Sequence, residues 1–307
     1  FCGNLAITAS SGPGIALKGE AMGLAVITET PLVICNVQRG GPSTGLPTKT
    51  EQADLFQALY GRNGEAPMVV IAASSPADCF NSAYEACKIA LEYMTPVILL
   101  TDGYIANGSE PWLIPNVSDL PNIDNRLTTD SKNFSPYNHG NEKLARPWAI
   151  PGTPGLEHRI GGLEKWDDSG HVSYDPDNHD YMVRLRQRKI EAVTQSIPDA
   201  EVYGDDSGEV LVIGWGGPYG AIRSAVKKMR ANGQSVSHLH LRHLNPFPKN
   251  LGEVLLKYNK VLVPELNLGQ LASVLRSKFL IDIESFNKIA GKPFITSEIM
   301  GKIEELL

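Results

Sequence analysis

The sequence predicts an α/β fold with two units, because strand-like and helix-like segments alternate twice along its 307 residues. The first alternation occupies residues 1–110 and the second residues 201–307. Strand-like runs of the first unit are short and apolar throughout, which is typical of parallel strands buried on both faces. We therefore expect a doubly wound sheet in the first unit and a second, smaller α/β domain after it.

Four strands and three helices are expected in the first unit. The helix that begins near Pro76 is the best marked, because Ser75 is placed to cap it and Asp78 lies near the positive end of its dipole. Its apolar positions predict an inner stripe of Phe80, Ala83, Tyr84, Cys87, Ala90, Leu91 and Met94. The expected strands are 5–9, 32–37, 68–73 and 97–101, and the expected helices are 14–25, 51–60 and 76–93.

Residues 111–200 are expected to form an extended arm followed by a linker helix. Prolines, Asn, Asp and Gly recur up to about residue 180, and no periodicity is sustained. Such a long stretch without secondary structure is rare in a compact domain, so we expect it to wrap a surface or a partner. The helix is expected over 181–197. The acidic run 175–180 is not a calcium loop, because Arg186 stands where a bidentate Glu is required.

The second unit repeats the alternation. Segment 214–220 is rich in glycine but lacks the GxGxxG spacing of a dinucleotide loop, so packing explains its glycines better. His238 and His240 share one face of a strand and His243 lies just beyond. Without a further ligand at suitable spacing, we expect packed or interface histidines. The expected strands are 210–214, 235–241 and 261–264, and the expected helices are 218–232, 251–258 and 269–279.

Composition and charge argue against several classes of protein. The net charge of −6 without a basic block argues against a nucleic-acid binder. No apolar run reaches the roughly 18 residues of a membrane span, and no signal peptide is visible, so we expect a cytoplasmic protein. The four cysteines lack CxxC spacing, which supports neither a zinc site nor an iron–sulfur site and favours reduced thiols.

The most informative segment is 36–51, Asn-Val-Gln-Arg-Gly-Gly-Pro-Ser-Thr-Gly-Leu-Pro-Thr-Lys-Thr-Glu. It follows an expected strand, and open α/β sheets bind ligands at the carboxyl ends of their strands. Arg39 can bind both oxygens of a carboxylate through its planar fork. Further donors are Ser43, Thr44, Thr48 and Lys49. An ordinary surface turn is the alternative interpretation. The turn 10–14 also offers free amides, although a tight strand-to-helix turn is favoured there.

The run 38–52 closely resembles the α subunit of 2-oxoacid:ferredoxin oxidoreductases, and most closely the 2-oxoglutarate branch. The likeness continues through 58–62, 95–108 and 151–158, and covers nearly the whole chain. It implies a pyrimidine-type domain of a thiamine-diphosphate enzyme, followed by a transketolase C-terminal-like domain. Because the chain opens close to its first strand, we expect a missing upstream segment. The family's Tyr-Pro-Ile-Thr-Pro motif and its glutamate facing the aminopyrimidine ring would lie there.

The resemblance also implies an activity and its residues. The enzyme would oxidatively decarboxylate 2-oxoglutarate with coenzyme A to succinyl-CoA, carbon dioxide and reduced ferredoxin. A pyruvate or branched-chain 2-oxoacid enzyme, or a non-catalytic assembly module, is the alternative. Catalytic residues would be Arg39, Thr48 and Lys49, with Ser43 and Thr44 beside Arg39 at the substrate. Cofactor contacts would come from Ser11, Gly12, Pro13 and Gly14.

The family's cofactors need a second chain. A magnesium site on the diphosphate requires a Gly-Asp-Gly and Asn set, and Thr101-Asp-Gly103 lacks the leading glycine. The resemblance therefore implies a β subunit that shares thiamine diphosphate with this chain and carries the magnesium and the iron–sulfur cluster, in a dimer of heterodimers. For Glu157 and His158, which lie in a family motif, structural and catalytic roles are equally open.

Overall fold

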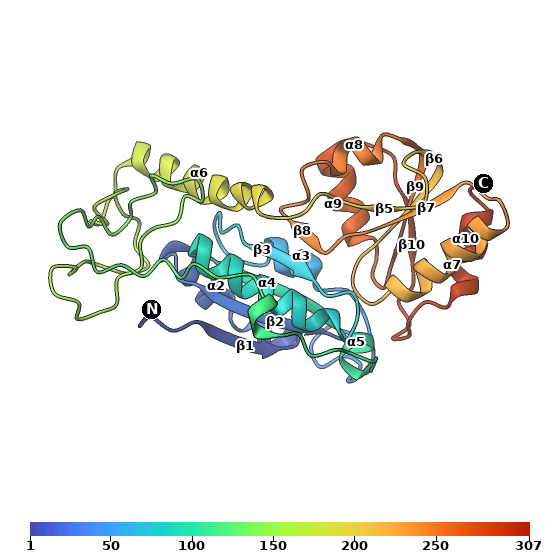
Figure 1. The fold of residues 1–307 in the computed structure, drawn as a ribbon, viewed down its shortest axis with the longest axis horizontal. Coiled ribbons are helices and arrows are strands. Elements are labelled where there is room, and N and C mark those ends of the chain that lie inside the picture. The colour runs from blue at the N-terminus through green and yellow to red at the C-terminus, as the bar shows by residue number, and fades with distance from the viewer.

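The computed structural model describes residues 1–307 and contains two five-stranded sheets, connected by an arm and a long helix (Figure 1). The first sheet has the order β1-β2-β4-β3-β8. Its first four strands are parallel, and β8 runs antiparallel to β3. The strands are β1 (Ala6–Ser10), β2 (Leu32–Gln38), β3 (Val69–Ala72), β4 (Pro96–Asp102) and β8 (His243–Asn245).

Helices cover both faces of the first sheet, so the predicted doubly wound arrangement is confirmed. On one face, α1 (Gly12–Ala16), α2 (Gly19–Ile27) and α3 (Leu55–Tyr60) contribute to the core. The other face packs against α4 (Asp78–Tyr93) and α6 (Pro176–Ala192). The single helix predicted over 14–25 was wrong in detail, because it is interrupted at residues 17 and 18. The short α5 (Gly103–Asn107) follows β4.

The buried face of α4 differs from the predicted stripe. Its fully buried apolar positions are Ala86, Ile89, Ala90 and Tyr93. Ala83, Cys87 and Ala90 of the predicted stripe do pack on the core. Other stripe residues are half-buried and face the arm: the Phe80 ring lies 5.2 Å from that of Trp112, and the Tyr84 hydroxyl donates to the Pro121 carbonyl. A long irregular segment thus covers apolar positions that a periodic pattern assigns to the core.

The second sheet has the order β10-β9-β6-β7-β5. Helices α7 and α10 pack on one face, and α8 and α9 on the other, as Figure 1 shows. Sequence patterns missed β5, β10 and α10, which are short or lack a clear apolar period. The elements are β5 (Val202–Tyr203), β6 (Gly208–Gly214), α7 (Tyr219–Ala231), β7 (Val236–His240), α8 (Leu251–Leu255), β9 (Tyr258–Glu265), α9 (Gln270–Phe279), β10 (Glu284–Asn287) and α10 (Thr296–Glu304).

The arm between α5 and α6 contains one short 3-10 helix, Val117–Asp119, and isolated bridges, in keeping with the irregular segment expected there. It lies against the first unit, where Trp148 is buried and its indole nitrogen donates to the Phe1 carbonyl. At the start of α6 the Asp175 carboxylate accepts from the Asn178 amide at 2.8 Å. The acidic run 175–180 therefore begins a helix. A second 3-10 helix, Val193–Gln195, follows α6.

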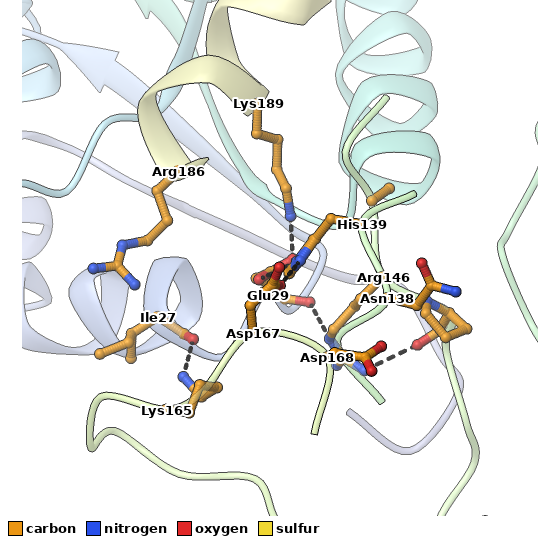
Figure 2. A network of polar contacts seen from close by, with 12 residues as sticks. Ile27, Glu29, Asn138, His139, Arg146, Lys165, Asp167, Asp168, Arg186 and Lys189 are labelled. Carbon is orange, nitrogen blue, oxygen red and sulfur yellow. Dashed lines mark hydrogen bonds and ion pairs between the residues drawn. The ribbon is translucent and has the colours of Figure 1, made fainter. Parts of the chain in front are cut away.

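A buried polar network attaches the arm and α6 to the turn after α2 (Figure 2). The Glu29 carboxylate contacts His139 Nε2 at 2.9 Å and the Lys189 ammonium. His139 Nδ1 lies 2.5 Å from Asp167, and Arg146 Nε donates to the Glu29 carbonyl at 3.2 Å. We call these five residues the Glu29 network. It brings together an arm, a helix and a sheet connection that are distant in sequence.

The two units share one apolar core. A cluster of 28 buried residues includes Ile34 and Ile98 of the first sheet together with Ile213 and Val263 of the second. Strand β8 comes from the second half of the chain yet completes the first sheet. The predicted boundaries at 110 and 200 stay predictions. No helix in the structure combines the length and apolar character that crossing a membrane requires.

Candidate active site

Three turns meet at the carboxyl edge of the first sheet. In the parallel register, Ser10 stands beside Asn36, and Gln38 stands beside Asp102. The ends of β1, β2 and β4 therefore lie side by side, and the turns that follow them form one surface. This edge contains the segment 39–52 and the turn 11–14, both predicted as parts of the site.

Arg39 is the first residue after β2, and its guanidinium has no partner. It is half-buried, it makes no ion pair or side-chain hydrogen bond, and its Nε is buried without an acceptor. A buried donor without a partner costs free energy, because it has lost water and gained nothing in return. The arrangement suits a group that receives an anionic acceptor from outside the chain.

The loop after Arg39 closes on itself. The Gly40 amide donates to the Lys49 carbonyl at 2.9 Å, and the Leu46 amide donates to the Gly40 carbonyl at 2.8 Å. Gly45 has a φ of +51°, and a side chain there would collide with the Gly40 carbonyl, so only glycine fits. The four predicted donors of this loop are exposed and make no side-chain hydrogen bonds: Ser43, Thr44, Thr48 and Lys49.

Two carboxyl groups that sequence patterns missed lie below this loop. Glu51 is only 7% exposed, and burial raises its pKa. Burial likewise raises the pKa of Asp54, although the hydrogen bond from Asn36 Nδ2 at 3.1 Å lowers it in part. Asn36 Oδ1 is itself buried without a partner. The available signal was an acidic residue directly after a glycine-rich loop, but only the tertiary fold shows that Glu51 turns inward.

The predicted cofactor turn, Ser11 to Gly14, adjoins the same carboxyl group. A side-chain carbon on Gly12 would lie 2.8 Å from Asp54 Oδ2, so the absence of a side chain lets the turn approach. Ser11 begins the five-residue α1 without capping it through its side chain. A side chain on Gly14 would collide with the Ser10 hydroxyl, as in a tight turn. The structure brings this turn to Asp54, which follows the Arg39 loop in the chain and also contacts Asn36 of β2. The cofactor role stays a prediction.

Asp102 lies at the centre of the edge, but its carboxylate oxygens already accept four hydrogen bonds from within the chain. It is 1% exposed and accepts hydrogen bonds from Thr50 Oγ1 and the amides of Tyr104, Ile105 and Gly217. Burial raises its pKa despite these donors. Asp102 therefore holds the second unit against the first, and is not an open metal ligand. No three His, Cys, Asp or Glu side chains lie together in a way that could hold a metal ion.

Glu157 and His158 lie in the arm, in a local turn. Glu157 accepts from the Gly155 amide at 3.2 Å, and His158 Nδ1 lies 2.7 Å from the Leu156 carbonyl. The His158 ring packs edge-on against Phe134. His158 Nε2 is buried without a partner, so the role of this pair stays a prediction. Three glycines of segment 214–220 are packing residues, as predicted, since a side-chain carbon on Gly214, Gly216 or Gly217 would lie within 3 Å of a neighbouring side chain. Gly220 is the exception, with open space around it.

Two family models match the chain. Residues 1–175 match the thiamine-diphosphate-binding domain of pyruvate flavodoxin/ferredoxin oxidoreductases. Residues 208–299 match core domain II of pyruvate:ferredoxin oxidoreductase. The two-unit α/β fold expected from the sequence thus agrees with the family's domain order.

Similar proteins point to the same family. A 2-oxoglutarate oxidoreductase subunit KorA of Mycobacterium tuberculosis is 60% identical over 97% of this chain and 46% of that protein. A 2-oxoglutarate synthase subunit KorA of Methanocaldococcus jannaschii is 34% identical over 97% of this chain and 77% of that protein. The structure of 2-oxoglutarate:ferredoxin oxidoreductase from Magnetococcus marinus, with 2-oxoglutarate, coenzyme A and succinyl-CoA bound, matches with a TM-score of 0.92 and 34% identity, over 97% of this chain and 52% of that chain.

The chain spans about half the length of several of these relatives, including those of M. tuberculosis and M. marinus. The high TM-score shows that the common part has the same fold throughout. The chain belongs to the family of 2-oxoacid:ferredoxin oxidoreductase α subunits, with a thiamine-diphosphate-binding domain followed by core domain II.

Proposed function

We propose that this chain is part of an enzyme that oxidatively decarboxylates 2-oxoglutarate with coenzyme A to succinyl-CoA, carbon dioxide and reduced ferredoxin. The M. marinus relative was solved with 2-oxoglutarate, coenzyme A and succinyl-CoA bound, which favours this substrate over pyruvate or a branched-chain 2-oxoacid. The single structural observation that carries the proposal is the unpaired guanidinium of Arg39 at the carboxyl edge.

Arg39 would bind a carboxylate of the 2-oxoacid. Its fork can hold both oxygens, and a partly buried position strengthens a charge-assisted contact. Ser43 and Thr44 are exposed next to it and would donate to the remaining oxygens. Thr48 and Lys49 would cover the bound substrate from the far end of the loop. These residues position the substrate, and they leave bond breaking to the cofactor.

The residues at this edge fit one half of a thiamine-diphosphate site. Thiamine diphosphate, when bound, would supply the carbon nucleophile and the electron sink for decarboxylation. The turn 11–14 and the side-chain oxygen of Asn36, Oδ1, which has no partner, would face the ring side of the cofactor. Glu51 and Asp54, whose pKa values burial raises, could each hold a proton there. The chain offers no group of three His, Cys, Asp or Glu side chains, as a metal site made wholly of side chains of this chain would need.

The proposal therefore includes a partner subunit. We place the magnesium, the cluster and the diphosphate contacts on a β subunit that shares the thiamine diphosphate, within a cytoplasmic dimer of heterodimers.

The test is the turnover of Arg39→Ala and Arg39→Lys in the assembled enzyme. A charge-assisted contact is worth about 1.5–3 kcal/mol, so Arg39→Ala should lose roughly 10- to 100-fold in kcat/KM. Arg39→Lys should recover only part of this loss, because it keeps the charge and loses the fork. The measurement is 2-oxoacid- and coenzyme A-dependent reduction of a viologen dye, with 2-oxoglutarate, pyruvate and 2-oxoisovalerate compared.

Arg159→Ala is the matched control, because Arg159 is exposed in the arm and makes no ion pair. It should leave turnover unchanged. Near-normal activity of Arg39→Ala would show that Arg39 does not bind the substrate. A preference for pyruvate or 2-oxoisovalerate would replace the proposed substrate, and no turnover of any 2-oxoacid by the assembled wild type would favour an assembly module.

A further inference from the structure

A cavity of about 530 Å³ lies at the junction of the two units, separate from the Arg39 loop. Ser74, which follows β3, lines it from the first unit. Residues 198–203, which run from the linker into β5, form a second wall, and the ends of β7 and α7 form a third. Its size falls within the range of roughly 300–1,000 Å³ that is typical of small-molecule sites.

The histidines predicted as packed side chains, His238 and His240, line this cavity. His238 is 2% exposed, and its Nε2 has no hydrogen-bond partner. Both ring nitrogens of His240 are also buried without partners. The Tyr219 ring packs against both imidazoles, at 5.8 and 4.9 Å between centroids, and fixes their orientation. His240 Nδ1 faces Gly214, since a side-chain carbon there would lie 2.9 Å from it, so the Nε2 atoms of the two rings are left for a ligand. Two unsatisfied ring nitrogens beside one cavity are unusual, since buried polar atoms normally find partners.

The protonation of these rings specifies what they can bind. Burial, and then the charge of Arg223, lowers the pKa of His238 to about 3, and burial also lowers that of His240 well below its ordinary value. Both rings are therefore neutral at pH 7. A neutral imidazole has one N–H donor and one acceptor nitrogen. The Nε2 atom of each ring can therefore meet a hydroxyl group, which is able both to donate and to accept.

The wall contains two arginines, and Arg223 is the one that makes no ion pair. It stacks on the Tyr203 ring, with Cζ 3.1 Å from the centroid. Arg242, by contrast, pairs with Asp78 and with Glu85, which also pairs with His243 at 2.8 Å. The acidic wall residues Asp199 and Glu201 are exposed to solvent.

We propose that this cavity binds a small hydroxylated organic anion, whose phosphate or carboxylate pairs with Arg223 and whose hydroxyl groups form hydrogen bonds with the Nε2 atoms of His238 and His240. Such a ligand satisfies both Nε2 atoms and the free guanidinium together. Because the cavity touches the first unit, the linker and the second unit, the ligand also connects the two halves of the chain.

The test is calorimetric titration of the assembled protein with ribose 5-phosphate and with gluconate, which represent the phosphate and the carboxylate form. Inorganic phosphate and ribose serve as fragments that lack one of the two features. We expect saturable binding, one equivalent per chain, of at least one of the two hydroxylated anions, and weaker binding of both fragments. Arg223→Gln should weaken that binding by about tenfold or more.

Two controls make the outcome decisive. Lys227→Gln lies on the exposed side of α7, one turn beyond Arg223, and should leave the affinity unchanged. Arg39→Ala should also leave it unchanged, because Arg39 belongs to the other site. The proposal is overturned if neither anion binds saturably, if Arg223→Gln binds as tightly as the wild type, or if either control weakens binding as much as Arg223→Gln does.

Discussion

At the scale of the residue, Gly217 and Asp102 form the central contact between the two units. The Gly217 amide donates to Asp102 Oδ2 at 2.8 Å, and both residues are buried. A side-chain carbon at Gly217 would lie 2.6 Å from the same oxygen. The glycine therefore allows a close approach that any other residue would prevent.

Gly217→Ala is expected to lower the free energy of unfolding by about 2–4 kcal/mol, because it separates a buried carboxylate from one of its four donors. Gly220→Ala is the matched control: Gly220 lies in α7, and nothing stands within 4 Å of an added carbon. Alanine favours a helix over glycine by up to about 1 kcal/mol, so this change should be neutral or stabilising. Equal stabilities of the two variants in urea unfolding would contradict this account.

At the scale of the element, the Glu29 network holds the arm in place. Burial alone would raise the pKa of Glu29, but Lys189 and His139 hold it well below its ordinary range. Burial alone would lower the pKa of His139, but Glu29 and Asp167 raise it. The carboxylates and the imidazolium thus stabilise one another, and an arm with little secondary structure gains a fixed position.

Glu29→Gln should destabilise the protein by about 3 kcal/mol or more, since it leaves the Lys189 ammonium buried and without a carboxylate. Glu20→Gln, an exposed position on α2, should change the stability by less than about 0.5 kcal/mol. Limited proteolysis should then cleave the arm faster in Glu29→Gln than in Glu20→Gln. Identical cleavage rates would show that the network does not hold the arm.

His139→Asn tests the charge of the imidazole through pH. Because the His139 pKa is raised in the folded protein, its stabilisation is complete below the ordinary histidine pKa and is lost as the pH rises through the raised value. Glu29 behaves oppositely and loses its contribution only in acid. The wild type should therefore exceed His139→Asn in unfolding free energy by more at about pH 6 than at about pH 9. A difference that does not vary with pH would show that the charge of His139 does not contribute to stability.

At the scale of the whole molecule, the alternation of strand-like and helix-like segments predicted most strands and helices, but it did not predict the contacts between them. The strand expected over 32–37 is β2 (Leu32–Gln38), because a buried parallel strand is apolar along its whole length. Strand β8 could not be predicted, since it has three residues and its partner β3 is far away in the sequence. At the site, the position of Arg39 followed from the strand that precedes it. The inward turn of Glu51 and the meeting of Gly12 with Asp54 depend on tertiary packing, which no local pattern contains.

The shared core predicts that both units unfold together. The 28-residue cluster crosses both sheets, and Gln52 accepts from the Leu266 amide while donating to the Trp215 carbonyl at 2.8 Å. Scanning calorimetry should show one transition whose calorimetric and van't Hoff enthalpies agree. Gln52→Ala should lower the temperature of that transition, because it leaves buried backbone groups of the second unit without hydrogen-bond partners. Gln195→Ala, an exposed change in the linker, should not. Two resolved transitions in the wild type would mean that the apolar contact between the sheets is too weak to couple them.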